Sequence, residues 1–237
     1  NMNKNSMIPL YQQLAEEIKE QIVSGKLMPR ERMLTESEFS KEYELSRITV
    51  RKAIEYLVDE GYVVRKQGIG TFVADKKLRR VLNNQINSFT EISEQSGGIA
   101  SADLVSVEWI TADGNVIKRL GVEDGSRVLK IVRVRNHDGE PVMIEENYYP
   151  ETMSFLLQEN LSGSTYRVFR DRGIIPSHAT KTFDICYATK NEAKLLHVKE
   201  HQALLLQKDV VYDQNQEPVH YTKMLINSER YQTTVSV

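Results

Sequence analysis

Apolar residues recur every four positions near the start of the chain, which is the spacing of one face of a helix. Residues 7–24 carry this pattern and Gly25 follows it, so a helix is predicted there with a glycine at its C-terminal end. Thr35 and Glu38 have the S/T-x-x-E spacing of a capping box. A second, short helix is therefore predicted to begin at this point and to end near Leu45.

A third helix is predicted after Ser46, whose hydroxyl can cap the first turn. Its apolar stripe consists of Val50, Ala53, Ile54, Leu57 and Val58. Gly61 ends this helix, and residues 62–73 alternate as a two-stranded hairpin around the sequence QGIG. The predicted order is helix, short helix, turn, helix and two-stranded wing.

The rest of the chain has a different pattern. Residues 74–87 are charged and polar with few apolar positions, which predicts a linker. Strands are predicted at 102–110, 126–135, 141–149, 178–187, 203–213 and 218–226, and helices at 113–121, 151–158, 164–172 and 190–197. The sequences HDGE and DQNQEP are typical of hairpin turns, so a mostly antiparallel α+β domain is predicted.

Charge is distributed unevenly between these two parts. The net charge is −2, yet residues 1–80 contain 15 Lys and Arg against 12 Asp and Glu. Residues 46–80 alone contain 9 basic and 4 acidic side chains. A local basic patch on an acidic protein is most often a nucleic-acid footprint.

The basic residues lie at the start of the third predicted helix. Arg47, Thr49 and Arg51 lie on or beside the face opposite the apolar stripe, whereas the acidic residues come later in the helix. A helix that enters the DNA major groove reads bases with its N-terminal residues, and Arg and Thr supply guanine and phosphate contacts. The pattern favours DNA binding over an ordinary solvated helix face.

The wing adds Arg65 and Lys66 next to glycines that allow close approach of the backbone. The Gly68–Gly70 pair is not a dinucleotide fingerprint, because the third glycine is missing and no helix is predicted after it.

Several classes of function receive no support from the sequence. It contains no apolar run long enough for a membrane span. A single cysteine, Cys186, is consistent with a reducing compartment, and a cytoplasmic protein is expected. His197 and His201 straddle a predicted helix end without an evident third ligand, so neither a metal nor another cofactor is expected. No catalytic constellation is apparent, and an enzyme is not expected.

Arg133 and Arg135 are the most informative residues of the second domain. They lie two apart on a predicted strand and project to the same face as Leu129 and Ile131. Two guanidinium groups on one anion would form a good clamp for phosphate or carboxylate. A solvent-exposed strand end, or neutralisation by Glu145 or Glu146 across the hairpin, is an equally good explanation, since the register is not fixed by the sequence.

The segments LYQQLAEEIKEQIVSGKLMP, LTESEF and LSRITVRKAIEYLVDEGYVVRKQGIGTFV resemble the winged helix-turn-helix domain of the GntR family of bacterial transcription repressors. The resemblance implies a DNA-binding domain over 1–74 followed by a linker at 75–87. It implies DNA contacts at Thr35, Glu36, Ser37, Ser46, Arg47, Ile48, Thr49, Arg51, Lys66, Gln67, Gly68 and Gly70. Leu34 replaces the usual proline, and Ser37 replaces an arginine that contacts DNA in the family.

Residues 88–237, above all KIVRVRNHDGEPVMIEENYYP and NQEPVHYTKMLINSERY, resemble the UTRA effector-binding domain of the HutC subgroup, which has a chorismate-lyase-like fold. The resemblance implies effector contacts at Ser88, Phe89, Thr90, Arg133, Arg135, Glu145, Ser164, Tyr166 and His220. The phosphate-holding positions match those of members that bind sugar phosphates. His220 and Ile226 replace a glutamate and a tyrosine that read the sugar.

The resemblance implies a homodimeric repressor that binds operator DNA under the control of a phosphorylated sugar or similar metabolite. A regulator with a non-phosphorylated effector, such as an amino-acid catabolite, is the alternative. A lyase-like enzyme is a second, more remote alternative.

Overall fold

The computed structural model describes residues 2–3, 6–75, 77–83 and 85–235. The chain divides into two compact units, residues 1–76 and residues 77–237. Each unit has hydrophobic clusters of its own and is described separately.

The first unit is a three-helix unit with a β-hairpin wing, as the apolar pattern predicts. Its helices are α1 (Leu10–Val23), α2 (Glu36–Glu42) and α3 (Arg47–Asp59), and its antiparallel strands are β1 (Val63–Lys66) and β2 (Gly70–Val73). The stripe of α3 packs on α1, and Leu14, Val50 and Leu57 are fully buried between them. This core orients α3 so that its other face is exposed.

The predicted caps of this unit are confirmed. Thr35 and Glu38 form a complete capping box at the start of α2. The Ser46 hydroxyl accepts a hydrogen bond from the Thr49 amide at the start of α3. Each cap satisfies an amide that the first helical turn leaves without a backbone partner.

The second unit is built on a six-stranded sheet in which every neighbouring pair is antiparallel, with the order β4-β5-β6-β9-β8-β7. The strands are β4 (Ala100–Thr111), β5 (Arg127–His137), β6 (Glu140–Pro150), β7 (His178–Tyr187), β8 (Ala203–Tyr212) and β9 (Pro218–Ile226). All six are predicted from the sequence. Asp138 and Gly139, both with positive φ, form the tight turn between β5 and β6.

In the described part of the second unit, five helices accompany the sheet. They are α4 (Phe89–Gln95), α5 (Gly114–Leu120), η1 (Glu151–Gln158, of 3-10 type), α6 (Thr165–Asp171) and α7 (Lys190–Leu196). Four of them occupy predicted positions. The helix α4 is not predicted, although Ser88 and Glu91 form a capping box whose spacing is visible in the sequence.

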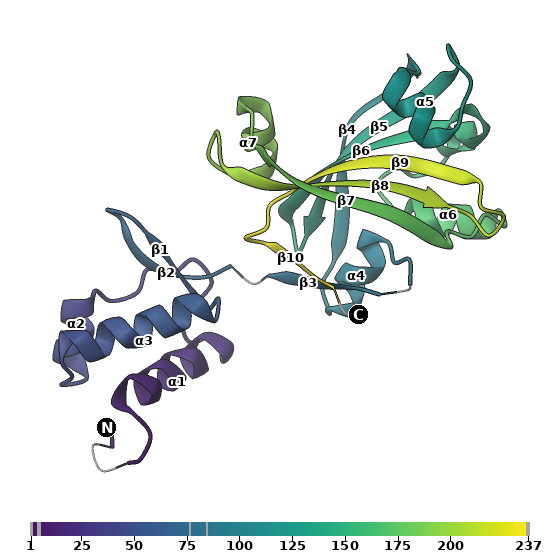
Figure 1. The fold of residues 1–237 in the computed structure, drawn as a ribbon. Helices are drawn as coiled ribbons and strands as arrows, with labels where there is room; N and C mark the ends of the chain where they lie inside the picture. The colour runs from purple at the N-terminus through teal and green to yellow at the C-terminus, as the bar shows by residue number, and fades with distance from the viewer. Residues whose placement is uncertain (1, 4–5, 76, 84, 236–237) are drawn as a thin grey trace. The chain divides into compact units, whose positions relative to one another are not determined.

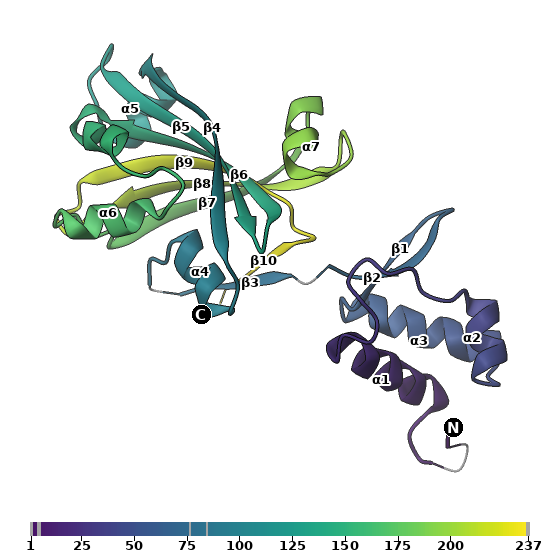
Figure 2. The ribbon, with the colours of Figure 1, turned by 180° about the vertical axis from the view of Figure 1, so that it is seen from behind.

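A separate two-stranded parallel ribbon corrects the linker prediction. Strand β3 (Leu78–Leu82) lies inside the predicted linker and pairs with β10 (Tyr231–Val235), close to the end of the chain. Figures 1 and 2 show this ribbon beside α4, and it forms a sheet of its own rather than extending the six-stranded sheet. Leu78 and Arg80 are buried while Arg79 and Val81 are exposed, which is the alternation of a strand. The sequence does not show this alternation because the buried position 80 is an arginine, whose charge suggests an exposed residue. Arg80 is buried because it donates hydrogen bonds to Thr233 and Gln207.

Candidate functional site

The exposed face of α3 carries the side chains that the sequence predicts to contact DNA. Arg47, Ile48 and Arg51 are exposed, and Ile48 is 79% exposed despite being apolar. An exposed isoleucine on a basic helix face suits contact with a thymine methyl group. Thr35 and Ser46 are occupied as helix caps, so their hydroxyls position the two helices of the motif.

Glu36 has a role that the sequence alone does not reveal. Its carboxylate accepts hydrogen bonds from Arg51 Nε and Nη2 at 3.2 and 3.1 Å and from Arg65 Nη2 at 3.2 Å. Arg47 donates in the same way to the Ser37 hydroxyl at 3.1 Å. These contacts link α2, α3 and the first strand of the wing, and they orient two arginines on one face.

The wing places its basic residue and its glycines at an exposed tip. The Lys66 ammonium lies 5.0 Å from the centre of the Phe72 ring. Gln67 and Gly68 are exposed, and Gly68 has a φ of +71°. Gly70 has a φ of +139°, and a Cβ there would lie 3.2 Å from Arg32 Nε, so both backbone conformation and space favour glycine.

The second unit contains a pocket on one face of the six-stranded sheet. Eight of the nine predicted effector residues line it, namely Ser88, Phe89, Arg133, Arg135, Glu145, Ser164, Tyr166 and His220. The ninth, Thr90, accepts a hydrogen bond from Arg135 Nη2 at 3.0 Å. The structure therefore brings all nine positions together, from α4, β5, β6, β9 and the start of α6.

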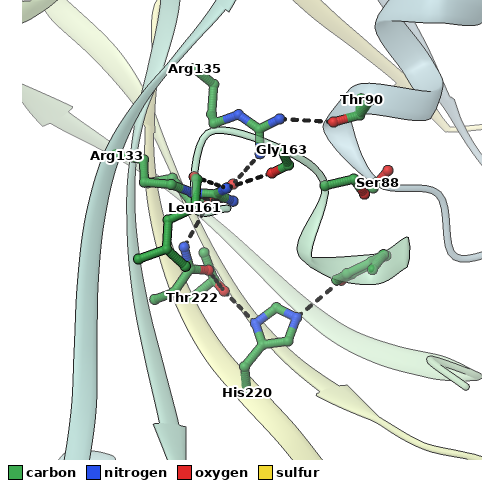
Figure 3. A network of polar contacts seen from close by, with 12 residues as sticks. Ser88, Thr90, Arg133, Arg135, Leu161, Gly163, His220 and Thr222 are labelled. Carbon is green, nitrogen blue, oxygen red and sulfur yellow. Dashed lines mark hydrogen bonds and ion pairs between the residues drawn. The ribbon is translucent and has the colours of Figure 1, made fainter. Parts of the chain in front are cut away.

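Arg133 and Glu145 are direct cross-strand partners, which settles the register that the sequence left open. Arg133 donates from Nε and Nη2 to the Glu145 carboxylate and from Nη1 to the carbonyls of Leu161 and Gly163 at 3.0 and 2.9 Å. Figure 3 shows the guanidinium between the strand and this loop. Arg133 is only 2% exposed, and it anchors the loop that leads to Ser164.

Arg135 is less fully engaged than Arg133. Its Nη2 donates to Thr90, and its Nη1 lies 3.7 Å from Glu145, but its buried Nε has no hydrogen-bond partner among the described residues. Burial lowers the pKa of Arg135 to about 10, partly offset by attraction to Glu145. The guanidinium also lies 4.8 Å from the centre of the Phe89 ring. Arg135, which lines the pocket, therefore has one buried donor without a hydrogen-bond partner among the described residues.

The Glu145 carboxylate stays ionised between these two arginines. Burial raises its pKa, but the charges of Arg133 and Arg135 and the hydrogen bonds from Asn147 and Arg133 outweigh this and lower the pKa to about 2.

His220 belongs to a chain of hydrogen bonds in which each group donates to the next, from Tyr166 to Glu145. The Thr222 hydroxyl donates to Asn147 Oδ1 at 2.7 Å, so it accepts from His220 Nδ1 at 2.6 Å. His220 Nε2 is then free to accept from the Tyr166 hydroxyl at 3.1 Å, and Asn147 donates onward to Glu145. Burial lowers the pKa of His220 to about 4, which keeps the imidazole neutral.

Sequence reasoning missed the opposite side of the pocket. Lys181 donates to Asp209 at 2.6 Å, Gln207 donates to the same carboxylate at 2.9 Å, and Arg80 donates to Gln207 at 2.6 Å. The alternation of side chains along β8 predicts that Gln207 and Asp209 lie on the same face of that strand. It does not predict that Lys181 of β7 lies in the same pocket, because this depends on how the strands pair.

The charged groups of the pocket do not balance. The lining includes four basic side chains, Arg80, Arg133, Arg135 and Lys181, and two acidic ones, Glu145 and Asp209, with His220 neutral. This leaves an excess of two positive charges, and buried charge of one sign is costly without a counter-ion. The pocket is therefore suited to an anion.

A winged helix with an exposed basic face, together with a second unit that holds a pocket lined by arginines, is the architecture of a DNA-binding transcriptional regulator with an effector domain. Residues 10–73 match the model of the gntR family of bacterial regulatory proteins, and residues 95–232 match that of the UTRA domain. The chain belongs to the GntR family and carries a UTRA domain. Its relatives include NagR, a fructoselysine operon regulator and PhnF, each of which is named as a transcriptional repressor.

Three relatives illustrate the similarity. The HTH-type transcriptional repressor NagR of Bacillus subtilis is 33% identical over 98% of this chain and 96% of its own length. The probable fructoselysine utilization operon transcriptional repressor of Escherichia coli K12 is 29% identical over 95% of this chain and 93% of its own. The crystal structure of PhnF from Mycobacterium smegmatis superposes with a TM-score of 0.71 at 28% identity, covering 94% of this chain and 98% of that one.

Two further observations concern the chain as a whole. Among the described residues, no helix is long and apolar enough to cross a membrane. The same residues include no group of three or more His, Cys, Asp or Glu side chains placed to hold a metal ion.

Proposed function

We propose that this protein is a transcriptional repressor whose affinity for operator DNA falls when a phosphorylated sugar, or a similar phosphorylated metabolite, fills the pocket. The observation that carries the proposal is the excess of two positive charges in the pocket, together with the buried Arg135 donor that has no partner among the described residues. A phosphate monoester carries nearly two negative charges near neutral pH, which matches this excess.

The phosphate is proposed to lie between Arg135 and the start of α4. Ser88 and Phe89, at the start of α4, line the pocket together with Arg135. Ser164, at the end of the loop that Arg133 anchors, contributes a hydroxyl, and Tyr166 of α6 lines the same pocket. Glu145, Asn147 and Thr222 lie farther along the pocket and offer acceptors and donors that suit sugar hydroxyls.

The relatives support the sugar part of the proposal. One of them is named for the utilization of fructoselysine, and both curated relatives are called repressors. A carboxylate would also bind an arginine fork. A non-phosphorylated effector is therefore the outcome against which the phosphate is tested.

The test is a thermal-shift screen of the whole chain with glucose 6-phosphate, glucosamine 6-phosphate, fructose 6-phosphate, their parent sugars and inorganic phosphate. A ligand at a hundred times its Kd stabilises the native state by about 2.7 kcal/mol, which shifts the melting temperature measurably. We expect a shift with a phosphosugar and none with its parent sugar.

The matched variants are Arg135→Ala in the pocket and Arg127→Ala outside it, where the exposed guanidinium contacts Glu151. Arg135→Ala is expected to weaken phosphosugar binding at least tenfold, and Arg127→Ala to leave it unchanged. Equal binding by wild type and Arg135→Ala would overturn the phosphate assignment. A response only to carboxylate compounds would replace it with a non-phosphorylated effector.

The regulator is proposed to act as a homodimer, because a two-fold operator requires two recognition helices. Exposed apolar side chains on the edge strand β7, including Phe183, Ile185 and Tyr187, support association with another chain. Sedimentation at micromolar concentration is expected to give twice the chain mass. A monomer both with and without DNA would contradict the proposal.

A further inference from the structure

A continuous series of contacts leads from the predicted anion site to strand β3. Arg135 lies over the Phe89 ring, with 4.8 Å from its guanidinium carbon to the ring centre. Phe89 meets Tyr231 edge to face at 5.9 Å between ring centres. Arg80 in turn lies over the Tyr231 ring, and its guanidinium carbon is 4.9 Å from the centre of that ring. Each step is a direct contact between buried side chains.

Arg80 is held by the ribbon and by the pocket at the same time. Its Nε and Nη2 donate to the Thr233 hydroxyl on β10 at 3.2 and 2.6 Å. Its Nη2 also donates to Gln207 on the sheet at 2.6 Å, and Gln207 in turn donates to Asp209. Arg80 is 7% exposed and lines the pocket. A group that enters the pocket near Gln207 therefore competes directly for the guanidinium that fixes β3.

The contacts of Arg80 matter for DNA binding because β3 lies close in the chain to the DNA-binding unit. Strand β2 of the wing ends at Val73 and β3 begins at Leu78, so only residues 74–77 separate the DNA-binding unit from the ribbon. The ribbon belongs to neither the six-stranded sheet nor the first unit, and β10 is its partner strand. Movement of β3 relative to the sheet must consequently be passed to a very short connection.

We propose that Arg80, stacked on Tyr231 and linked through Phe89 to Arg135, couples occupancy of the effector pocket to the DNA-binding unit through β3. The proposal rests on the proposed function of the pocket and names the residues that carry its regulation. An anion that draws Arg135 away from Phe89, or Arg80 away from Gln207, changes how tightly β3 is held. Because coupling is reciprocal, DNA bound by the first unit changes the same contacts.

The test compares Arg80→Gln with Arg79→Gln, a matched control that removes a charge from the exposed side of the same strand. DNA affinity is measured by fluorescence anisotropy on a duplex that the wild-type protein selects from random-sequence DNA. Each titration is run without ligand and with a saturating concentration of the screened phosphosugar that binds best. Separate calorimetric titrations confirm that every variant binds this probe and is saturated.

Wild type and Arg79→Gln are expected to lose at least tenfold in DNA affinity when the probe is added, within the usual range of coupling. Arg80→Gln removes a positive charge from the pocket lining and is expected to bind the probe more weakly. At saturation, its DNA affinity is expected to change less than threefold. Thr233→Val, which keeps the charge of Arg80 but removes its anchor on β10, is expected to behave like Arg80→Gln. It also guards against a folding defect in the first variant. A tenfold loss of DNA affinity on saturation with the probe, in both Arg80→Gln and Thr233→Val, would overturn the proposal.

A second readout separates this inference from the proposed function. If none of the phosphosugars binds wild type, the effector assignment fails, and the coupling is tested with DNA alone by hydrogen–deuterium exchange. Bound DNA is expected to change the exchange of the β3 and β10 amides in wild type and in Arg79→Gln, but much less in Arg80→Gln. Unchanged exchange of both strands in wild type would contradict the coupling role.

Discussion

Glu145 is the residue on which the pocket depends most, because it faces two buried arginines at once. Its replacement by Gln leaves two guanidinium groups without an ionised partner in a low-dielectric site. Removing one partner of a buried ion pair typically costs about 3 to 5 kcal/mol. We expect Glu145→Gln to lower the free energy of unfolding by this amount, as measured by urea denaturation.

The control for this prediction is Glu151→Gln, since Glu151 pairs with Arg127 on the surface, where both side chains are more than half exposed. An exposed pair contributes less than about 1 kcal/mol. If the two substitutions had equal effects, the pocket arginines would not depend on Glu145.

His220 makes stability depend on pH. Its folded-state pKa of about 4 lies below the ordinary value of 6.5, so the unfolded chain binds a proton first as the pH falls. Stability is therefore complete above pH 6.5 and decreases toward pH 4.5, by about 2 to 3 kcal/mol over this range. Glu145, with a pKa of about 2, remains ionised in both states over most of this window.

The measurement is the free energy of unfolding from pH 4.5 to 7 for wild type and for His220→Gln, which cannot titrate there. We expect the wild-type curve to fall more steeply at low pH. Parallel curves would show that His220 is not buried in its neutral form.

At the scale of elements, α3 and the wing form the predicted DNA-contacting surface. Arg51, held by Glu36, is expected to contact a phosphate. Arg51→Ala should weaken binding to every DNA sequence and reduce the slope of log affinity against log salt by about 1. Lys26→Ala, an exposed lysine after α1 and outside the predicted contact set, should leave the slope unchanged. An unaltered slope in Arg51→Ala would remove this residue from the interface.

The elements also show how far sequence reasoning reaches. Periodicity and turn residues identify α1, α2, α3, the wing and all six strands of the main sheet, because each has a continuous local pattern. Strands β3 and β10 are short and owe their pairing to a contact between distant parts of the chain. Helix α4 shows a capping box at Ser88 and Glu91, but it is too short for an apolar stripe to stand out.

The pocket is a similar case. The resemblance to known effector domains supplies Arg133, Arg135 and Glu145, and the structure adds the register that makes them partners. Lys181, Gln207 and Asp209 come from strands at the far side of the sheet, and only the strand order brings them to the same pocket. No local pattern encodes that order.

At the scale of the whole molecule, a DNA-binding unit and an effector-binding unit are joined in one chain. Ligand and DNA must influence each other if a single conformational equilibrium connects them. The most direct test is an anisotropy titration of the wild-type protein on its selected duplex, with and without the best-binding phosphosugar and its parent sugar. We predict that the phosphosugar raises the Kd for DNA at least tenfold while the parent sugar leaves it unchanged. A Kd that stays the same when the pocket is saturated with the phosphosugar would contradict the proposed regulation.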